Sequence, residues 1–256
     1  MKRWAIMSWL VASWIMAISP VAAAPAAIIH VNGIQTTLET ATASMLLLKD
    51  RVQQRANASN YIYGIAYNAT AGFMADLLEL YRQKTHEETD ARSFWRLIDH
   101  DLLPGKWMTE AEFGDYLARF IQENIYPDMG EHLAIYHQYL AESRKIVFVA
   151  HSQGNMYANA EVNMLISGPD DAGGKVSVVG IASPARYVLP GSHYVTSSWD
   201  NVINVLRSLY PVLPANINLG FQPFHDWSGH SFVKSYMDTS LPAHERIVDA
   251  VIRQAS

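Results

Sequence analysis

One serine stands between a buried-strand pattern and a helix pattern in the segment KIVFVAHSQGN. The run Ile146–Val149 is apolar at every position and rich in β-branched residues, which is typical of a strand buried on both faces of a parallel sheet. Apolar residues then recur at helical spacing through Asn155–Ser167. A serine in the tight turn between strand and helix lifts its hydroxyl above the sheet edge, provided that the residues two positions to either side are small, as they are here. The pattern predicts that Ser152 is a nucleophile.

The segment resembles the nucleophile elbow of the α/β-hydrolase superfamily. Its AHSQG form, with Ala150 in place of the first glycine, is similar to elbows of some bacterial lipases and esterases. The resemblance implies an α/β-hydrolase fold, with a mostly parallel, doubly wound sheet. It also implies the chain order nucleophile, acid, histidine. It extends over most of the chain after residue 27 and is weakest between about residues 72 and 136.

The acid of such a site must lie at the same sheet edge as the serine, because the carboxyl ends of parallel strands meet at one edge. A strand is predicted at Ser192–Ser198, and Asp200 follows its exit, at the family's position for the acid. Asp170 and Asp171 precede the strand predicted at Val176–Ile181 and therefore belong to the opposite edge. Asp200 is the predicted acid; the alternative is an N-cap for the helix predicted at Asn201–Leu209.

Three histidines follow Asp200 along the chain. His244 lies in a terminal amphipathic helix pattern and is expected to be a solvated or N-terminal helix residue. His225 and His230 frame the loop HDWSGH, and a helix is predicted directly after it. A histidine in a loop just before a packing helix matches the family's last catalytic position. His230 is therefore the predicted base, with His225 as the alternative base and Asp226 as the fallback acid.

Acyl transfer also requires hydrogen-bond donors for the oxyanion. The backbone N–H of Gln153, directly after the nucleophile, is the first predicted donor. The second comes from a loop after an early strand, predicted at Ala27–Val31 and followed by Asn32-Gly33-Ile34. The backbone N–H of Ile34 is the predicted donor, because the preceding glycine permits a close backbone approach.

The N-terminus predicts export. Lys2 and Arg3 precede an apolar stretch over residues 4–18, and Pro20 and a run of alanines follow, which is the layout of a secretory signal peptide. Residues 1–23 are the predicted signal peptide, cut near Ala23 and Ala24, so the protein is expected to be secreted or periplasmic. An uncleaved membrane anchor is the alternative.

The remaining residues 24–256 are expected to form a single α/β domain. Thr36 and Glu39 match a capping box that opens a helix running to about Gln54, and a strand is predicted at Tyr61–Tyr67. Residues 72–136 form a predicted helical insertion that includes one crossover helix. The remainder of this insertion is expected to form a lid or an acyl-chain pocket over the site; the alternative is that its aromatic residues are ordinary core.

Composition narrows the class of protein. The chain has 256 residues, of which 50% are hydrophobic and 17% charged, with a formal net charge of −5 and no cysteine. This balance argues against a basic groove for nucleic acid, and the lack of thiols excludes thiolate metal sites and dithiol redox chemistry. Neither a HExxH motif nor a phosphate-binding loop is present. No cofactor or metal is expected.

Together, the residues and the resemblance predict an exported serine hydrolase. Its substrates are expected to be carboxylic esters, lipid or other acyl esters, cleaved by Ser152, His230 and Asp200 through an acyl-enzyme. A small-molecule or lipid ester is the expected partner, with transient contact to a membrane surface. The alternatives are a thioesterase or acyltransferase that uses the same residues, and a non-catalytic binding protein of the same fold.

Overall fold

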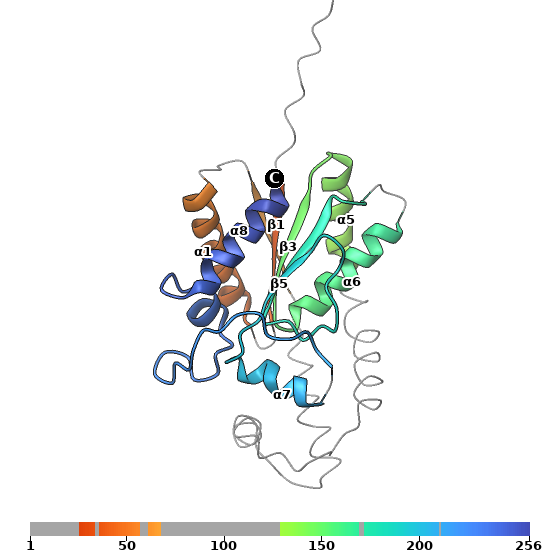
Figure 1. The fold of residues 1–256 in the computed structure, drawn as a ribbon. Coiled ribbons are helices and arrows are strands. Elements are labelled where there is room, and N and C mark those ends of the chain that lie inside the picture. Colours follow the sequence, from red (N-terminus) through yellow and green to blue (C-terminus); the bar gives the residue numbers. More distant parts are fainter. Residues whose placement is uncertain (1–25, 34–35, 57–60, 68–128, 169–171, 210) are drawn as a thin grey trace, which may run out of the picture.

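The computed structural model describes residues 26–33, 36–56, 61–67, 129–168, 172–209 and 211–256 (Figure 1). The described strands are β1 (Ala27–Val31), β2 (Ile62–Ala66), β3 (Ile146–His151), β4 (Val176–Ile181) and β5 (His193–Val195). The described helices are α1 (Leu38–Ala56), α5 (Met129–Ala141), α6 (Gly154–Ser167), α7 (Asn201–Leu209), the π-helix η3 (Phe232–Tyr236) and α8 (Pro242–Ala255).

The five strands form one sheet in the order β2-β1-β3-β4-β5, and every neighbouring pair is parallel. The three central strands β1, β3 and β4 are almost entirely buried, as their continuous apolar runs predict. The prediction of an α/β fold with a parallel sheet is therefore confirmed. Strand order reverses between β1 and β3, so the loops after these two strands face one crevice at the carboxyl edge.

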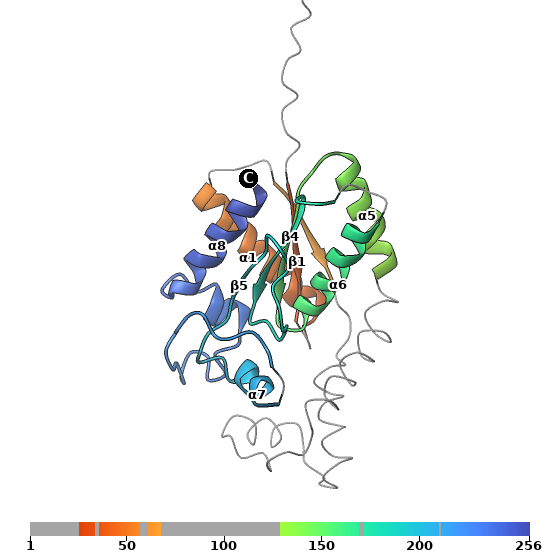
Figure 2. The ribbon, with the colours of Figure 1, turned by 45° about the vertical axis from the view of Figure 1, so that its right-hand side comes forward.

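Helices cover both faces of the sheet. Figure 1 and Figure 2 show α1 and α8 on one face and α5 and α6 on the other, with α7 beyond the carboxyl ends of the strands. Phe148 of β3 is fully buried and meets Tyr136 of α5 edge-on, with 5.0 Å between ring centroids. Helices from both faces contact β3, and β3 is the strand that directly precedes Ser152.

Two predicted helix starts differ in detail. Helix α1 is capped by Thr37 instead of Thr36, because the Thr37 hydroxyl accepts the backbone N–H of Thr40 at 3.1 Å. The helix predicted after His230 is a short π-helix, capped by the Ser231 hydroxyl, which accepts the N–H of Lys234. Strand β5 is also shorter than the predicted Ser192–Ser198, and within residues 211–256 no further strand follows it.

Several predicted segments lie outside the described residues. These are the signal peptide at residues 1–23 and residues 72–128 of the helical insertion. The end of that insertion, residues 129–136, forms the first part of α5, which leads into β3. Within the described ranges, no helix combines the length and apolar character needed to cross a membrane.

Candidate active site

Ser152 lies in a strained turn directly after β3. Its φ is +55°, a left-handed conformation that non-glycine residues rarely adopt. The Ser152 N–H donates to the carbonyl of Ile181 at 2.9 Å, which extends the pairing of β3 with β4 by one residue. The chain then turns at once into α6, which begins at Gly154. This geometry matches the predicted strand–turn–helix and directs the serine away from the sheet ladder.

Two glycines allow the end of β1 to approach this turn. A Cβ on Gly154 would lie 2.6 Å from the carbonyl oxygens of both Val31 and Asn32. A Cβ on Gly33 would lie 2.9 Å from the Cβ of Ser152. Both distances are below 3.0 Å, a separation that real Cβ atoms essentially never show, so a side chain at either position would displace its neighbours. The backbone after β1 therefore packs directly against the nucleophile turn.

The side chain of Asn155 holds the turn from below. Its amide donates to the carbonyls of Ala150, Ser152 and Ile181 at 3.1, 2.8 and 3.0 Å, and the residue is 2% exposed. The carbonyls of Ser152 and Ile181 also accept the backbone N–H groups of Asn155 and Ser152, so the amide adds a second bond to each and ties the turn to the ends of β3 and β4. Sequence analysis did not identify Asn155, because nothing in its spacing indicates that three carbonyls converge on it.

The structure brings the three predicted side chains together. The Nε2 atom of His230 lies 2.9 Å from the Oγ of Ser152. On the other side of the ring, Nδ1 lies 2.9 Å from both carboxylate oxygens of Asp200. Asp200 is fully buried and Ser152 is 5% exposed, whereas the His230 side chain keeps 14% of its surface. The hydroxyl, imidazole and carboxylate thus form one continuous hydrogen-bonded chain.

Asp200 accepts two hydrogen bonds besides the one from His230. Its Oδ1 accepts the N–H of Ile203 at 3.0 Å, so Asp200 also caps helix α7, as the alternative interpretation had it. Its Oδ2 accepts the hydroxyl of Tyr236 at 2.8 Å. With these donors in place the carboxylate accepts Nδ1–H of His230, which leaves Nε2 bare toward the Ser152 hydroxyl. The imidazole therefore has the orientation of a general base.

Tyr236 is a second residue that sequence analysis missed. It is fully buried in η3, and burial raises the pKa of its hydroxyl well above its ordinary value. The hydroxyl also accepts the N–H of Ser197, so it links the end of β5 to the Asp200 carboxylate. Only the fold brings residues 197, 200 and 236 together, and the sequence pattern carries no signal for this contact.

The loop that carries His230 packs on the loop that carries Asp200. The N–H of Asn201 donates to the carbonyl of Ser228 at 2.9 Å. Gly229 has φ +63°, and a Cβ there would collide with the carbonyl of Trp199. Glycine is therefore required at this position for two reasons, the left-handed backbone and the close approach. The two loops fix the distance between the imidazole and the carboxylate.

Asp226, the fallback acid, organises this loop and makes no hydrogen bond to the His230 ring. Its carboxylate accepts the hydroxyls of Ser228 and Ser235 at 2.7 and 2.6 Å, and the N–H of Ser231 at 2.8 Å. Burial raises the pKa of Asp226, but the hydrogen bonds from these serines outweigh it and leave the pKa below its usual value. These three short hydrogen bonds explain why Asp226 lies on the histidine loop without being the partner of the His230 ring.

The other histidines lie elsewhere. His225, the alternative base, is half exposed and pairs with Asp238 at 2.9 Å, and His244 lies in the first turn of α8. His30 of β1 is buried in the core, and burial lowers its pKa to about 4. Of the histidines after Asp200, His230 is the one bonded to Ser152.

One predicted oxyanion donor lies within the described residues. Gln153 follows Ser152 at the N-terminal end of α6, where backbone N–H groups and the positive end of the helix dipole favour an anion. The other predicted donor, Ile34, lies outside the described residues. Gly33, which precedes it, is close to Ser152, and Asn32 steadies the turn by donating from its amide to the Gly33 carbonyl at 2.9 Å.

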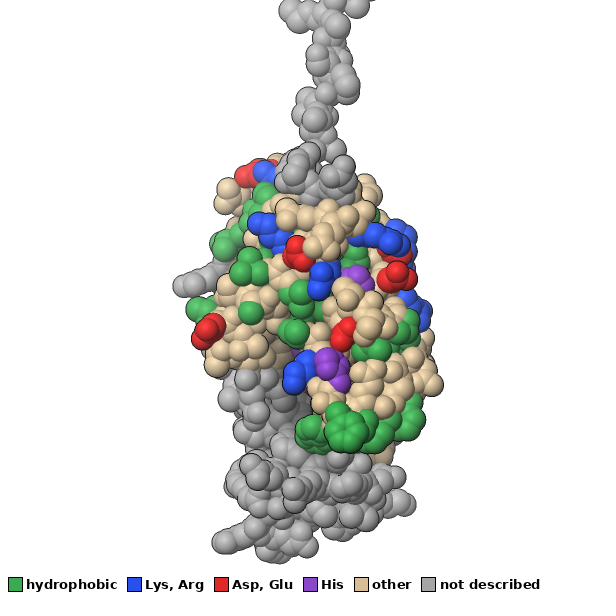
Figure 3. Space-filling view, turned by 90° about the vertical axis from the view of Figure 1, so that its left-hand side faces the viewer, with side chains coloured by type: hydrophobic (Ala, Val, Ile, Leu, Met, Phe, Trp, Pro, Cys, Tyr) green, Lys and Arg blue, Asp and Glu red, His purple; other side chains and the backbone are tan. Residues whose placement is uncertain are grey.

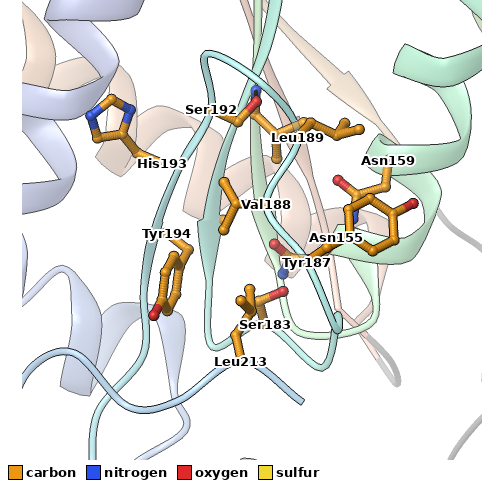
Figure 4. Close-up of a pocket in the computed structure, with 12 residues that line it drawn as sticks. Asn155, Asn159, Ser183, Tyr187, Val188, Leu189, Ser192, His193, Tyr194 and Leu213 are labelled. Carbon is orange, nitrogen blue, oxygen red and sulfur yellow. Dashed lines mark hydrogen bonds between the residues drawn. The ribbon is translucent and has the colours of Figure 1, made fainter. Parts of the chain in front are cut away.

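A small cavity lies on the other side of Asn155. It has a volume of about 10 Å³ and is lined by Asn155 and Asn159 of α6 and by Tyr187, Val188 and Leu189 of the segment after β4 (Figure 4). This is roughly the space of one water molecule. The cavity is therefore too small to hold an organic substrate.

The described residues contain no group of three or more His, Asp or Glu side chains arranged to hold a metal ion. Comparisons of the chain with protein-family models, with curated proteins and with solved structures find no match. The chemistry of the site is therefore inferred from its own geometry.

Proposed function

We propose that this chain is a serine hydrolase of the α/β-hydrolase fold that cleaves carboxylic esters through an acyl-enzyme. The observation that carries this proposal is the hydrogen-bonded chain from Ser152 through His230 to Asp200, with 2.9 Å at each link. A buried serine with positive φ, aligned on a histidine that is in turn held by a buried carboxylate, is the arrangement that activates a hydroxyl for attack.

The proposed reaction uses these groups in order. The Ser152 oxygen attacks the ester carbonyl carbon while its proton passes to Nε2 of His230. The carbonyl oxygen becomes an anion, which the N–H groups of Gln153 and Ile34 stabilise. The anion collapses, the C–O bond to the alcohol breaks, and the alcohol leaves with the proton from His230. Water then attacks the acyl-serine by the same route and releases a carboxylic acid.

The sheet topology supports the choice of fold. The nucleophile follows the central strand β3, the oxyanion turn follows its neighbour β1, and the acid follows β5 on the other side. In open parallel sheets, ligands bind at the carboxyl edge where the strand order reverses, which here lies between β1 and β3. The described groups of the proposed site, Ser152, Asp200 and His230, come from loops at this one edge.

Exposed aromatic residues support an apolar acyl group. Trp199 and Trp227 stand close in sequence to Asp200 and His230, and they are 41% and 52% exposed. The ring of Trp199 lies 5.6 Å from that of Phe221, which is also exposed. Figure 3 shows hydrophobic side chains gathered at the end of the molecule where α7 lies. Such side chains favour esters of lipid or other apolar acids, and transient contact with a membrane surface.

Labelling with a fluorophosphonate probe tests the proposal directly, because the probe phosphonylates an activated serine. The purified protein is expected to label, and Ser152→Ala, His230→Ala and Asp200→Asn are expected to lose labelling. His225→Ala is the matched control on the same loop and is expected to label like the wild type. A folded wild-type protein that does not label would overturn the proposed function.

Chromogenic esters of increasing acyl length then test the substrate class. Longer acyl chains are expected to raise kcat/KM, because the exposed aromatic residues offer apolar surface to them. An optimum at acetate would contradict the lipid-ester proposal and leave esterase activity standing. A thioester series run beside it distinguishes the thioesterase alternative. Export is a separate proposal, tested by the N-terminal sequence of the protein recovered from the periplasm or the medium.

A further inference from the structure

His151, the residue before the nucleophile, makes a contact that the proposed reaction does not yet use. Its Nε2 lies 2.8 Å from the backbone carbonyl oxygen of His230. The two imidazole rings lie 4.9 Å apart, and the His151 ring also packs against Phe232 and Tyr236, at 5.6 and 6.3 Å. The His151 side chain is thus hydrogen-bonded to the backbone of His230, and the side chain of His230 is hydrogen-bonded to Ser152.

The hydrogen bond fixes the tautomer of His151. Burial, followed by the neighbouring His230, lowers the pKa of His151 well below its ordinary value, so the ring is neutral at neutral pH. A carbonyl oxygen can only accept, so Nε2 must carry the proton and Nδ1 must be bare. Nδ1 faces the turn after β1, since a Cβ on Gly33 would lie 3.1 Å from it. The ring therefore lies between the turn after β1 and the histidine loop.

Three hydrogen bonds hold the backbone around His230. Its N–H donates to the Ser228 hydroxyl at 3.2 Å, and the next N–H, of Ser231, donates to Asp226 at 2.8 Å. Both of these partners belong to the same loop as His230, so they shape the loop without fixing it to the nucleophile. The third bond, from His151, crosses to β3 and fixes the His230 carbonyl to the residue next to Ser152.

We propose that His151 is a positioning residue for acyl transfer, whose Nε2–H holds the His230 carbonyl so that the His230 ring stays aligned on the Ser152 hydroxyl. This inference rests on the proposed function. The contacts form a closed cycle. Ser152 is covalently joined to His151, the His151 side chain donates to the His230 carbonyl, and the His230 imidazole is hydrogen-bonded to the Ser152 hydroxyl. Such a closed cycle of contacts limits the displacement of His230 when its imidazole receives and returns the proton.

Two substitutions separate the hydrogen bond from the shape of the ring. His151→Phe keeps a planar ring against Phe232 and Tyr236 but has no donor. His151→Gln loses the ring but places an amide N–H at similar reach. His225→Phe is the control, because it makes the same chemical change on the histidine loop at a half-exposed residue that does not contact Ser152, His230 or Asp200.

Steady-state hydrolysis of a chromogenic ester and the rate of fluorophosphonate labelling provide the readout. His151→Phe is expected to lower kcat and the labelling rate about tenfold with little change in KM, because a net hydrogen bond of ordinary strength is lost in alignment and not in substrate binding. His151→Gln is expected to restore both to within about threefold of the wild type. An unchanged kcat in His151→Phe, or equal losses in both variants, would overturn the proposal.

A second measurement does not depend on turnover. A histidine Nδ1–H donated to a buried carboxylate gives a strongly downfield proton resonance, which here reports the bond from His230 to Asp200. This resonance is expected to broaden or disappear in His151→Phe through faster exchange with water and to persist in His151→Gln and His225→Phe. If the wild type shows the resonance but has no esterase activity, the proposed function fails and the positioning of His230 is still tested. A resonance equally sharp in His151→Phe contradicts the positioning role.

Discussion

The hydroxyl of Tyr236 donates to Oδ2 of Asp200 at 2.8 Å and at the same time accepts the N–H of Ser197 at 3.0 Å. Both Tyr236 and Asp200 are fully buried, so water cannot replace either bond. The acid of the site is therefore held by a tyrosine from the helix that follows the histidine. Helix η3 contributes to the site through its side chain as well as through the loop before it.

Tyr236→Phe is expected to destabilise the fold by about 1–3 kcal/mol, because the Asp200 carboxylate and the Ser197 N–H each lose a buried partner. The catalytic rate is expected to fall about tenfold, since Asp200 then holds His230 less firmly. Urea unfolding and ester hydrolysis measure the two effects. Tyr63→Phe is the control: among the described residues its buried hydroxyl has no hydrogen-bond partner, so its removal should lower neither stability nor rate.

The two aspartates of the site are expected to respond differently to amidation. Asp200→Asn places a donor against Nδ1 of His230, disfavours the productive tautomer and is expected to lower kcat about 10³–10⁴-fold with little loss of fold. Asp226→Asn disturbs the bonds to Ser228, Ser231 and Ser235, and is expected to cost about 1–3 kcal/mol of stability and less than tenfold in kcat. Thermal unfolding and kcat, measured on both variants, check the assignment. The reverse order of the two kcat losses would make Asp226 the acid.

Strand positions were predictable because burial on both faces leaves a continuous apolar run in the sequence. Residues 27–31, 146–149 and 176–181 read as strands and are strands. The sheet-edge argument then placed Asp200 correctly relative to Ser152, since all carboxyl ends meet at one edge. The weak strand β5 was overestimated at both ends, because its exposed His193 and half-buried Tyr194 lack that continuous pattern.

The supporting contacts were not predictable, because they join residues far apart in sequence. His151 to His230 spans 79 positions and Tyr236 to Asp200 spans 36, and no periodicity links either pair. Asn155 was within the predicted helix, but its role depends on three carbonyls, of Ala150, Ser152 and Ile181, that only the folded turn brings within reach of its amide. Local patterns thus identified the groups proposed to react, and tertiary contacts decide how those groups are held.

The close approach of Gly154 to the end of β1 predicts a sharp contrast between two glycines. Gly154→Ala is expected to cost more than about 2 kcal/mol and to abolish fluorophosphonate labelling, because its Cβ meets two backbone carbonyls at 2.6 Å. Gly130→Ala is the control: among the described residues, nothing outside its chain neighbours and its own helix backbone lies within 4 Å of the added Cβ. It is expected to change stability by less than about 1 kcal/mol, because the residue lies in the first turn of α5. Chemical denaturation of both variants measures the contrast, and similar effects of the two would show that the turn is not tightly packed.

The buried His30 predicts a loss of stability in mild acid. Its pKa is about 4 in the folded protein, against 6.5 for the ordinary side chain, because burial disfavours the charged ring. Between these two values the unfolded chain binds more protons than the folded one, so the free energy of unfolding falls as pH drops from about 6.5 to 4. The full effect of this one residue is about 3 kcal/mol, at about 1.4 kcal/mol per pH unit over this window. His151, whose pKa is lowered in the same direction, adds to the slope. Urea unfolding between pH 7 and pH 4 should therefore show a shallower decline in His30→Gln than in the wild type. Equal slopes in the two proteins would mean that His30 is not kept neutral by the fold.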